Sequence, residues 1–224
     1  MSDTQHSTVD RQRPWDARLA RQLVVPLKDS WVTPNHLTSL RLLIGMAAAA
    51  AFMPGSYAWS NLASLFLILS NFADHTDGEL ARISGKTSRA GHIYDLASDA
   101  AVTILLFIGM GIGVGAKSGI ALQFPPLLLG AAAGCAIALI FFLRMRIEEL
   151  AGKAATRQAS LGGFETEDVL YLLPLVTLCN AVVPFLVTAS ICAPLFAIWV
   201  AIDYLRVVRR QRSTQAGAAA GVAQ

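Results

Sequence analysis

Four aspartates lie close together in the sequence, and their spacing matches helical faces. They are Asp74, Asp77, Asp95 and Asp99, within the stretch DHTDGELARISGKTSRAGHIYDLASD. On a helix the first two share a face at a spacing of three residues, and the last two share a face at a spacing of four. If the two helices are antiparallel and joined by a short loop, both pairs meet at the same end of the bundle.

Carboxylates gathered in a pocket of low dielectric repel one another, and cations among them offset that repulsion. Ligands that are all oxygen suit Mg²⁺ or Mn²⁺. Four carboxylates have enough oxygens to bridge two ions about 3.5–4 Å apart, the arrangement used for phosphoryl displacement. The competing explanation is that Arg82 or Arg89 simply neutralises an aspartate. We expect a site of two divalent ions, because ionisable residues in membrane spans are functional by default.

The residues between the aspartates are small or basic in a way that suits a phosphorylated ligand. Gly78 and Ala81 would lie inside a helix, where glycine costs about 1 kcal/mol relative to alanine. A ligand lying against the backbone would account for that cost. Arg82 adds a fixed positive charge that can hold a phosphate. Gly91, one turn before Asp95, would let its helix approach a neighbour closely.

The composition places these residues in a membrane protein. Of the 224 residues, 54% are hydrophobic and 15% are charged, whereas a soluble domain carries about 25% charged residues. The apolar residues are clustered in stretches long enough to cross a bilayer. This excludes a disordered chain, a secreted disulfide scaffold and a soluble enzyme. The net charge of +3 is too small to suggest nucleic acid as a partner.

The predicted fold class is all-α: a polytopic bundle of six transmembrane helices preceded by an amphipathic helix on the membrane surface. We expect the surface helix at about 14–29 and the membrane domain over 14–208. The expected spans are about 36–53, 57–74, 92–115, 120–143, 168–187 and 189–207. The fifth and sixth are divided near Val183 and Pro184. Residues 1–13 and 209–224 are expected to be disordered tails.

Basic residues predict the orientation of the spans. With the N-terminus in the cytoplasm, every lysine and arginine except Lys117 falls on the cytoplasmic side, as the positive-inside rule requires. We therefore expect a multi-pass protein of the cell (inner) membrane with both termini cytoplasmic. Glycines at 109, 111, 113 and 115, and the pair Gly130 and Gly134, allow helix backbones to approach closely, within one bundle or between subunits. A homodimer is the expected assembly.

The aspartate segment resembles the signature of the CDP-alcohol phosphotransferase class-I family. The pattern D-x2-D-G-x2-A-R-x8-G-x3-D-x3-D is met without a gap from Asp74 to Asp99. Eight fixed positions would match by chance on the order of once in a billion windows at average residue usage. The resemblance extends to Pro34, Asn35, Thr38 and Arg41 at the first span, and it covers roughly residues 14–208.

The resemblance implies a specific chemistry. Family members transfer the phosphoryl-bearing half of a CDP-alcohol, usually CDP-diacylglycerol, to a small polar alcohol acceptor and release CMP, in phospholipid biosynthesis. By resemblance, Asp74, Asp77 and Asp95 would bind the metals, and Asp99 would touch one metal and act as the general base. The resemblance places five residues around the nucleotide and its pyrophosphate: Asn35, Thr38, Gly78, Ala81 and Arg82.

The acceptor and the wider function class are less defined by the sequence. Arg144, Arg146, Lys153 and Arg157 follow the fourth span and could bind a phosphorylated acceptor, or could act only as a topology signal. Leu96 and Ala100 depart from the glycerophosphate and cardiolipin branch of the family. One alternative keeps the chemistry but uses a soluble CDP-alcohol and a polyol phosphate. Alternatives of other classes are a cation transporter, which would place its acids nearer the midplane, and a prenyltransferase.

Overall fold

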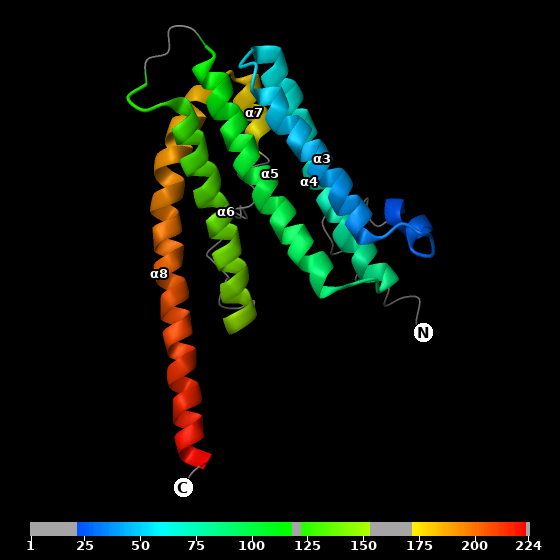
Figure 1. Cartoon of the computed structure of the whole chain (residues 1–224), viewed down its shortest axis with the longest axis vertical. Helices are drawn as coiled ribbons and strands as arrows, with labels where there is room; N and C mark the ends of the chain where they lie inside the picture. The colour runs from blue at the N-terminus through cyan, green and yellow to red at the C-terminus, as the bar shows by residue number, and fades with distance from the viewer. Residues whose placement is uncertain (1–21, 118–121, 153–171, 223–224) are drawn as a thin grey trace.

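The computed structural model describes residues 22–117, 122–152 and 172–222. All regular structure in these residues is helical, as predicted, and no strand occurs among them. The elements are η1 (Val25–Leu27), α3 (Pro34–Phe52), α4 (Tyr57–Ser84), α5 (Arg89–Gly115), α6 (Pro126–Ala151), α7 (Leu173–Leu178) and α8 (Val182–Val222) (Figure 1). Residues 14–21 of the expected surface helix at 14–29 lie outside the described residues, and residues 22–27 are helical, with η1 over Val25–Leu27.

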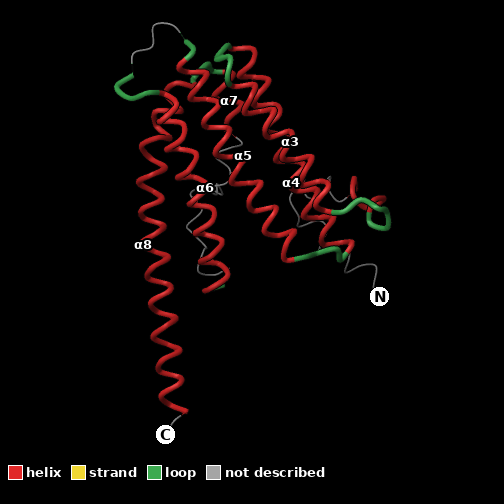
Figure 2. The backbone as a smooth tube through the Cα atoms, viewed as in Figure 1, coloured by secondary structure: helices red, strands yellow, loops and turns green. Residues whose placement is uncertain are grey.

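The long helices form a bundle in which α3 lies between α4 and α5. Helix α3 packs against both of them, α5 packs against α6, and α6 packs against α8. The tube in Figure 2 shows that the start of α3, the connection from α4 to α5 and the end of α6 lie toward one end of the bundle, the end toward which α8 extends. The connections from α3 to α4, from α5 to α6 and from α7 to α8 lie at the other end.

A tight return joins the two helices that carry the aspartates. Helix α4 ends at Gly85, whose φ of 66° is a left-handed conformation that suits glycine. Helix α5 begins after Ser88, whose side chain accepts a hydrogen bond from the backbone N–H of Gly91. Lys86 in this return donates a hydrogen bond to the backbone carbonyl of Ser30, 2.7 Å away. The return therefore brings both aspartate pairs to one end of the bundle and links them to the segment before α3.

Glycines allow the helices to pack closely within the chain. A Cβ atom added to Gly109 would collide with the backbone carbonyl of Ala49 in α3, and one added to Gly130 of α6 would collide with the carbonyl of Phe107 in α5. The sequence allowed these glycines to pack either within one bundle or between subunits. In the structure they contact helices of the same chain.

We expect Gly130→Ala to lower the free energy of unfolding by about 1–3 kcal/mol, because the added methyl group must displace backbone atoms. Thermal unfolding in detergent measures the effect. Gly115→Ala is the matched control, since a Cβ there would lie 3.9 Å from Pro126 Cγ, an ordinary contact. Equal melting temperatures for the two variants would contradict the close packing of α5 against α6 at Gly130.

Three helices in the described part are long and apolar enough to cross a membrane: α5, α6 and the segment Val182–Gln211 of α8. The prediction of six spans is therefore met only in part. Helices α3 and α4 are less apolar because polar side chains lie along them, including the buried Arg41 and Ser70. Several of these side chains build the site described below.

The predicted boundary between the fifth and sixth spans is wrong. The helical structure is interrupted at residues 179–181, where Asn180 has a φ of 53°. Helix α8 then continues through Val183, Pro184 and residue 188. Pro184 lies in the first turn of α8, where its missing N–H costs no hydrogen bond. Helix α8 also continues to Val222, into the segment expected to be a disordered tail. Alanines in that segment favour helix.

Basic residues are distributed unevenly between the two ends of the bundle. The end that holds the α4–α5 connection (Figure 1) carries nearly all of the lysines and arginines in the described residues. Lys117, after α5, is the exception in this part of the chain. This is the charge asymmetry that the sequence predicted.

Candidate metal and nucleotide site

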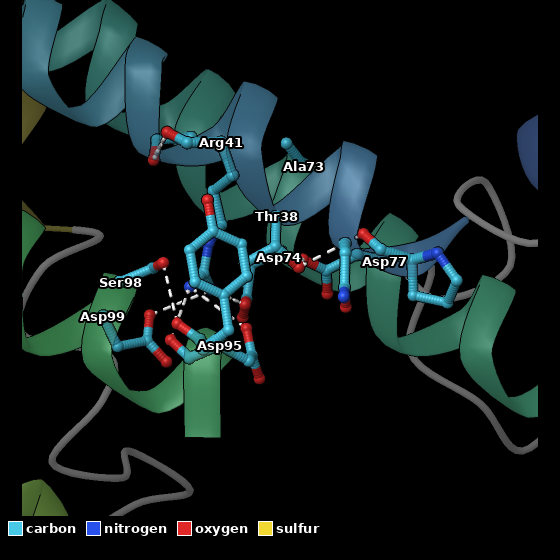
Figure 3. Close-up of polar contacts among 12 residues, drawn as sticks. Thr38, Arg41, Ala73, Asp74, Asp77, Asp95, Ser98 and Asp99 are labelled. Carbon is cyan, nitrogen blue, oxygen red and sulfur yellow. Dashed lines mark hydrogen bonds and ion pairs between the residues drawn. The ribbon is translucent and has the colours of Figure 1, made fainter. Parts of the chain in front are cut away.

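Three of the four aspartates converge. Asp74 projects from α4, and Asp95 and Asp99 project from successive turns of α5. One carboxylate oxygen of each lies within 4.8 Å of the other two. Figure 3 shows these carboxylates gathered around one point below α3. We call these three residues the acid triad.

The buried guanidinium of Arg41, on α3, lies at the centre of the acid triad. Its side chain is 2% exposed and forms ion pairs with Asp74, with Asp99 at 2.9 Å and with Asp95 at 3.1 Å. Nη2 also donates a hydrogen bond to the backbone carbonyl of Asp95 at 3.1 Å. Because α3 lies between α4 and α5, this one cation reaches acids on both helices.

The acid triad fits a divalent cation on its own chemistry. Its donors are all carboxylate oxygens, which Mg²⁺ and Mn²⁺ prefer. One guanidinium offsets one of three ionised carboxylates, so two negative charges are left. Asp95 Oδ1 is buried and accepts no hydrogen bond from the described residues. Its 3.1 Å contact with Arg41 Nη2 is an ion pair without hydrogen-bond geometry. Asp74, Asp95 and Asp99 are the residues that would hold a divalent cation.

Asp77 lies apart from the acid triad. Its carboxylate is 5% exposed and accepts a 2.8 Å hydrogen bond from the hydroxyl of Thr38, on α3. Figure 3 shows Asp77 displaced along α4 from the other three carboxylates. The predicted group of four metal ligands therefore divides into three converging acids and one acid bound to α3.

The predicted nucleotide residues differ in exposure: Asn35 and Arg82 are exposed, Gly78 and Ala81 are half-buried, and Thr38 is buried. A Cβ on Gly78 would meet no described atom within 4 Å, so packing within this part of the chain does not require glycine there. Gly91 lies against the side chain of Asn35, whose Oδ1 would be 2.9 Å from a Cβ on that glycine. Arg82 is 69% exposed and pairs with the buried Glu79 at 3.0 Å.

A cavity of about 520 Å³ lies beside two members of the acid triad, Asp74 and Asp99. Arg41, Asp74 and Asp99 form its polar wall, whereas Leu106 and Phe141 contribute to its apolar wall. The cavity is lined by α3, α4, α5 and α6. Sequence reasoning did not predict it, because a cavity depends on how four helices meet and leaves no periodic pattern in any of them.

The structure does not bring the predicted acceptor residues to this cavity. The guanidinium of Arg144 lies 5.8 Å from the centre of the Phe196 ring, and Arg146 pairs with Glu149 one turn away. Neither is among the described residues that line the cavity. Lys153 and Arg157 lie outside the described residues.

Arg41 is the functional residue whose role the sequence analysis missed. It was noted only as part of the resemblance at the first span. The available signal was an arginine inside the apolar run from Leu40 to Leu43, since an ionisable residue in such a run marks a functional site by default.

The fold and the site together define an α-helical bundle of membrane type with a carboxylate centre fit for a divalent cation. The chain belongs to the CDP-alcohol phosphatidyltransferase family, whose model matches residues 31–205. This range extends from just before α3 into α8. Members of this family generally use a divalent metal, in accord with the acid triad.

Three curated relatives are similar to this chain. A bifunctional IPC transferase and DIPP synthase of Rubrobacter xylanophilus is 27% identical over 64% of the chain. A CDP-diacylglycerol–glycerol-3-phosphate 3-phosphatidyltransferase of Cereibacter sphaeroides is 34% identical over 35% of it, and an archaetidylinositol phosphate synthase of Pyrococcus horikoshii is 33% identical over 37%. The matched regions span 30%, 36% and 42% of these relatives' own lengths, in that order.

Proposed function

We propose that this protein is a membrane phosphotransferase that moves the phospho-alcohol half of a CDP-alcohol to an acceptor hydroxyl and releases CMP. CDP-diacylglycerol is the proposed donor, and phospholipid biosynthesis is the proposed role. The observation that carries the proposal is the convergence of Asp74, Asp95 and Asp99 beside an open helix face at Gly78. Two of the three relatives are named as transferases, which supports the same reaction type.

The acid triad would hold the divalent ions, Mg²⁺ or Mn²⁺ and two in number, with Asp77 as a further ligand if it leaves Thr38. Such ions, when bound, neutralise charge that develops on the pyrophosphate as its bond breaks. Asp99 lines the cavity and its side chain is 51% exposed, so an acceptor hydroxyl can reach it. The acceptor oxygen bonds to the β-phosphorus, the bond to the bridging oxygen breaks, CMP leaves, and Asp99 takes the hydroxyl proton.

The nucleotide would lie along the exposed edge formed by α3 and α4. Gly78 leaves room for it next to the backbone, and Ala81 adds little bulk one turn further on. Arg82 is exposed enough to turn from Glu79 toward a phosphate. Asn35 and Thr38, in the first turns of α3, complete the proposed pocket, and Gly91 makes room for Asn35.

A lipid donor is favoured over a soluble CDP-alcohol by the shape of the cavity. Its polar wall is formed at the acid triad, and its apolar wall includes the buried side chains of Leu67 and Leu106. A donor with a charged head and an alkyl chain matches both walls, whereas a soluble polyol donor would leave the apolar wall in contact with water.

We expect Ala138→Trp to raise the KM for a long-chain CDP-diacylglycerol by on the order of tenfold, because Ala138 lines the cavity and the indole ring would occupy it. The KM for a donor with very short chains should change much less. Leu139→Trp is the matched control, since the neighbouring Leu139 is 46% exposed on α6. Equal effects on long-chain and short-chain donors would point to the soluble-donor alternative.

The acceptor, the assembly and the topology belong to the same proposal. The proposed topology has six spans in the cell (inner) membrane. The basic end of the bundle would face the cytoplasm, which places both termini inside. There a water-soluble alcohol meets a lipid donor. To bind a phosphorylated acceptor together with Arg157, Arg144 and Arg146 would have to leave Phe196 and Glu149. A homodimer and the absence of a nucleic-acid partner are further parts of the proposal.

The test is release of CMP by purified protein given labelled CDP-diacylglycerol and a divalent metal. Acceptors to be compared are serine, inositol phosphate, glycerol phosphate, inositol and choline. Release that needs both the metal and one of these acceptors is the expected result. Cation flux through reconstituted vesicles without any CMP release would contradict the proposal and favour a transporter.

A further inference from the structure

Arg41 is held firmly between the two helices that carry the acid triad. Its backbone carbonyl accepts a hydrogen bond from Ser70 of α4 at 3.1 Å. Thr38, one turn earlier, donates to Asp77 of α4, and the hydroxyls of Ser39 and Tyr94 of α5 lie 2.9 Å apart. These contacts hold the backbone of α3 at Arg41 against α4 and α5, whereas the guanidinium itself is held by its ion pairs.

The guanidinium lies against the carboxylates that would bind a divalent cation. Its two terminal nitrogens face carboxylate oxygens of Asp74, Asp95 and Asp99, the same three residues whose carboxylates converge for a metal ion. A divalent ion binds such oxygens at about 2.0–2.6 Å, and two cations this close together repel each other strongly where water is scarce. A guanidinium and a metal ion that bind the same three carboxylates therefore compete for them.

The hydrogen bonding of Arg41 is incomplete. Nε and Nη1 donate no hydrogen bond of good geometry to the described residues, although the side chain is 2% exposed. The guanidinium is thus held mainly by charge, and few directed hydrogen bonds are lost when a metal ion draws the carboxylates away from it.

We propose that Arg41 is a built-in counterion of the metal centre. Without a divalent ion it holds the three carboxylates together, and it sets the affinity of the centre by competing with the ion for them. Arg41 is then a positioning residue, since it acts on the carboxylates and not on the substrate. This inference rests on the metal centre of the proposed function.

The first measurement is the Mn²⁺ dissociation constant of purified wild type and Arg41→Gln. We expect Arg41→Gln to bind Mn²⁺ at least about tenfold more tightly, because a like charge within a few ångströms no longer opposes the ion. The second is the melting temperature in EDTA and in saturating Mn²⁺. The variant should melt below wild type in EDTA, where its carboxylates repel one another, and Mn²⁺ should raise its melting temperature more than that of wild type.

Two further variants complete the design. Arg41→Lys keeps the charge but loses the fork of donors, so both readouts should lie between wild type and Arg41→Gln. If Arg41→Gln cannot be purified folded, values for Arg41→Lys equal to wild type overturn the inference. Arg206→Gln removes an exposed charge from α8 and should change neither readout, which controls for the general field of the protein.

The outcomes separate this inference from the proposed function. If wild type binds Mn²⁺ and Arg41→Gln binds it equally or more weakly, the counterion role is wrong and the metal centre stands. If only Arg41→Gln binds Mn²⁺, the guanidinium blocks the centre, which supports the inference and contradicts metal use by the wild type. If neither binds, both are wrong.

Discussion

We expect Asp99→Asn to lower the turnover number for CMP release by on the order of 10²-fold or more, and to leave binding of CDP-alcohol and Mn²⁺ largely intact. Asparagine has the shape of aspartate and keeps one oxygen toward a cation, but it cannot accept the proton of the acceptor hydroxyl. Asp99 is the expected base because it combines membership of the acid triad with a half-exposed side chain on the cavity wall.

The measurement compares turnover with donor and Mn²⁺ affinities for the same preparation. Asp203→Asn makes the same chemical change on α8, outside the acid triad, and should leave turnover unchanged. Unaltered turnover in Asp99→Asn would remove Asp99 as the base. A loss of Mn²⁺ affinity as large as the loss of turnover would restrict its role to that of a metal ligand.

Gly78→Ala is expected to affect stability and activity in opposite directions. The added methyl group meets no described atom within 4 Å, and alanine favours helix over glycine by about 1 kcal/mol, so the melting temperature should rise. If the nucleotide lies against this backbone, the same methyl group displaces it. A misplacement of about 1 Å can cost on the order of 10²-fold, and kcat/KM should fall by about that much.

Thermal unfolding and kcat/KM measured on one preparation test this pair of effects. Gly115→Ala, at the end of α5 away from the acid triad, adds the same methyl group in ordinary contact and should leave kcat/KM unchanged. Full activity in a stabilised Gly78→Ala would mean that the nucleotide binds elsewhere.

Much of the site follows from local sequence. The spacing of Asp95 and Asp99 fixes a common helical face, and the short segment after Gly85 returns the chain so that Asp74 can approach them. Ser88 and Gly85 supply the capping and turning residues that this return needs. The convergence of these three acids could therefore be predicted without coordinates.

The parts that the sequence did not define depend on contacts between distant segments. Asp77 was assigned to the metals because it lies three residues from Asp74, but the hydroxyl of Thr38 draws it toward α3. Arg41 becomes the centre of the site only because α3 lies between α4 and α5, which no helical periodicity encodes. Both outcomes were set by the position of one helix.

The boundary between α7 and α8 was misplaced for a local reason. The sequence analysis divides the fifth and sixth spans near Val183 and Pro184, although proline is well tolerated in the first turn of a helix. The break lies a few residues earlier, at Asn180, whose left-handed backbone ends α7. An asparagine indicates the end of a helix less clearly in a sequence than a proline does. The predicted boundary was therefore placed at the proline.

Titration of purified, metal-free protein with Mn²⁺ tests the central claim most directly, that α4 and α5 jointly hold a divalent centre. We expect saturable binding of up to two ions in wild type, and a large loss of affinity when Asp74 on α4 or Asp95 on α5 is replaced by asparagine. No saturable binding, or binding that survives the replacement of Asp74, Asp95 and Asp99 together, would contradict the account.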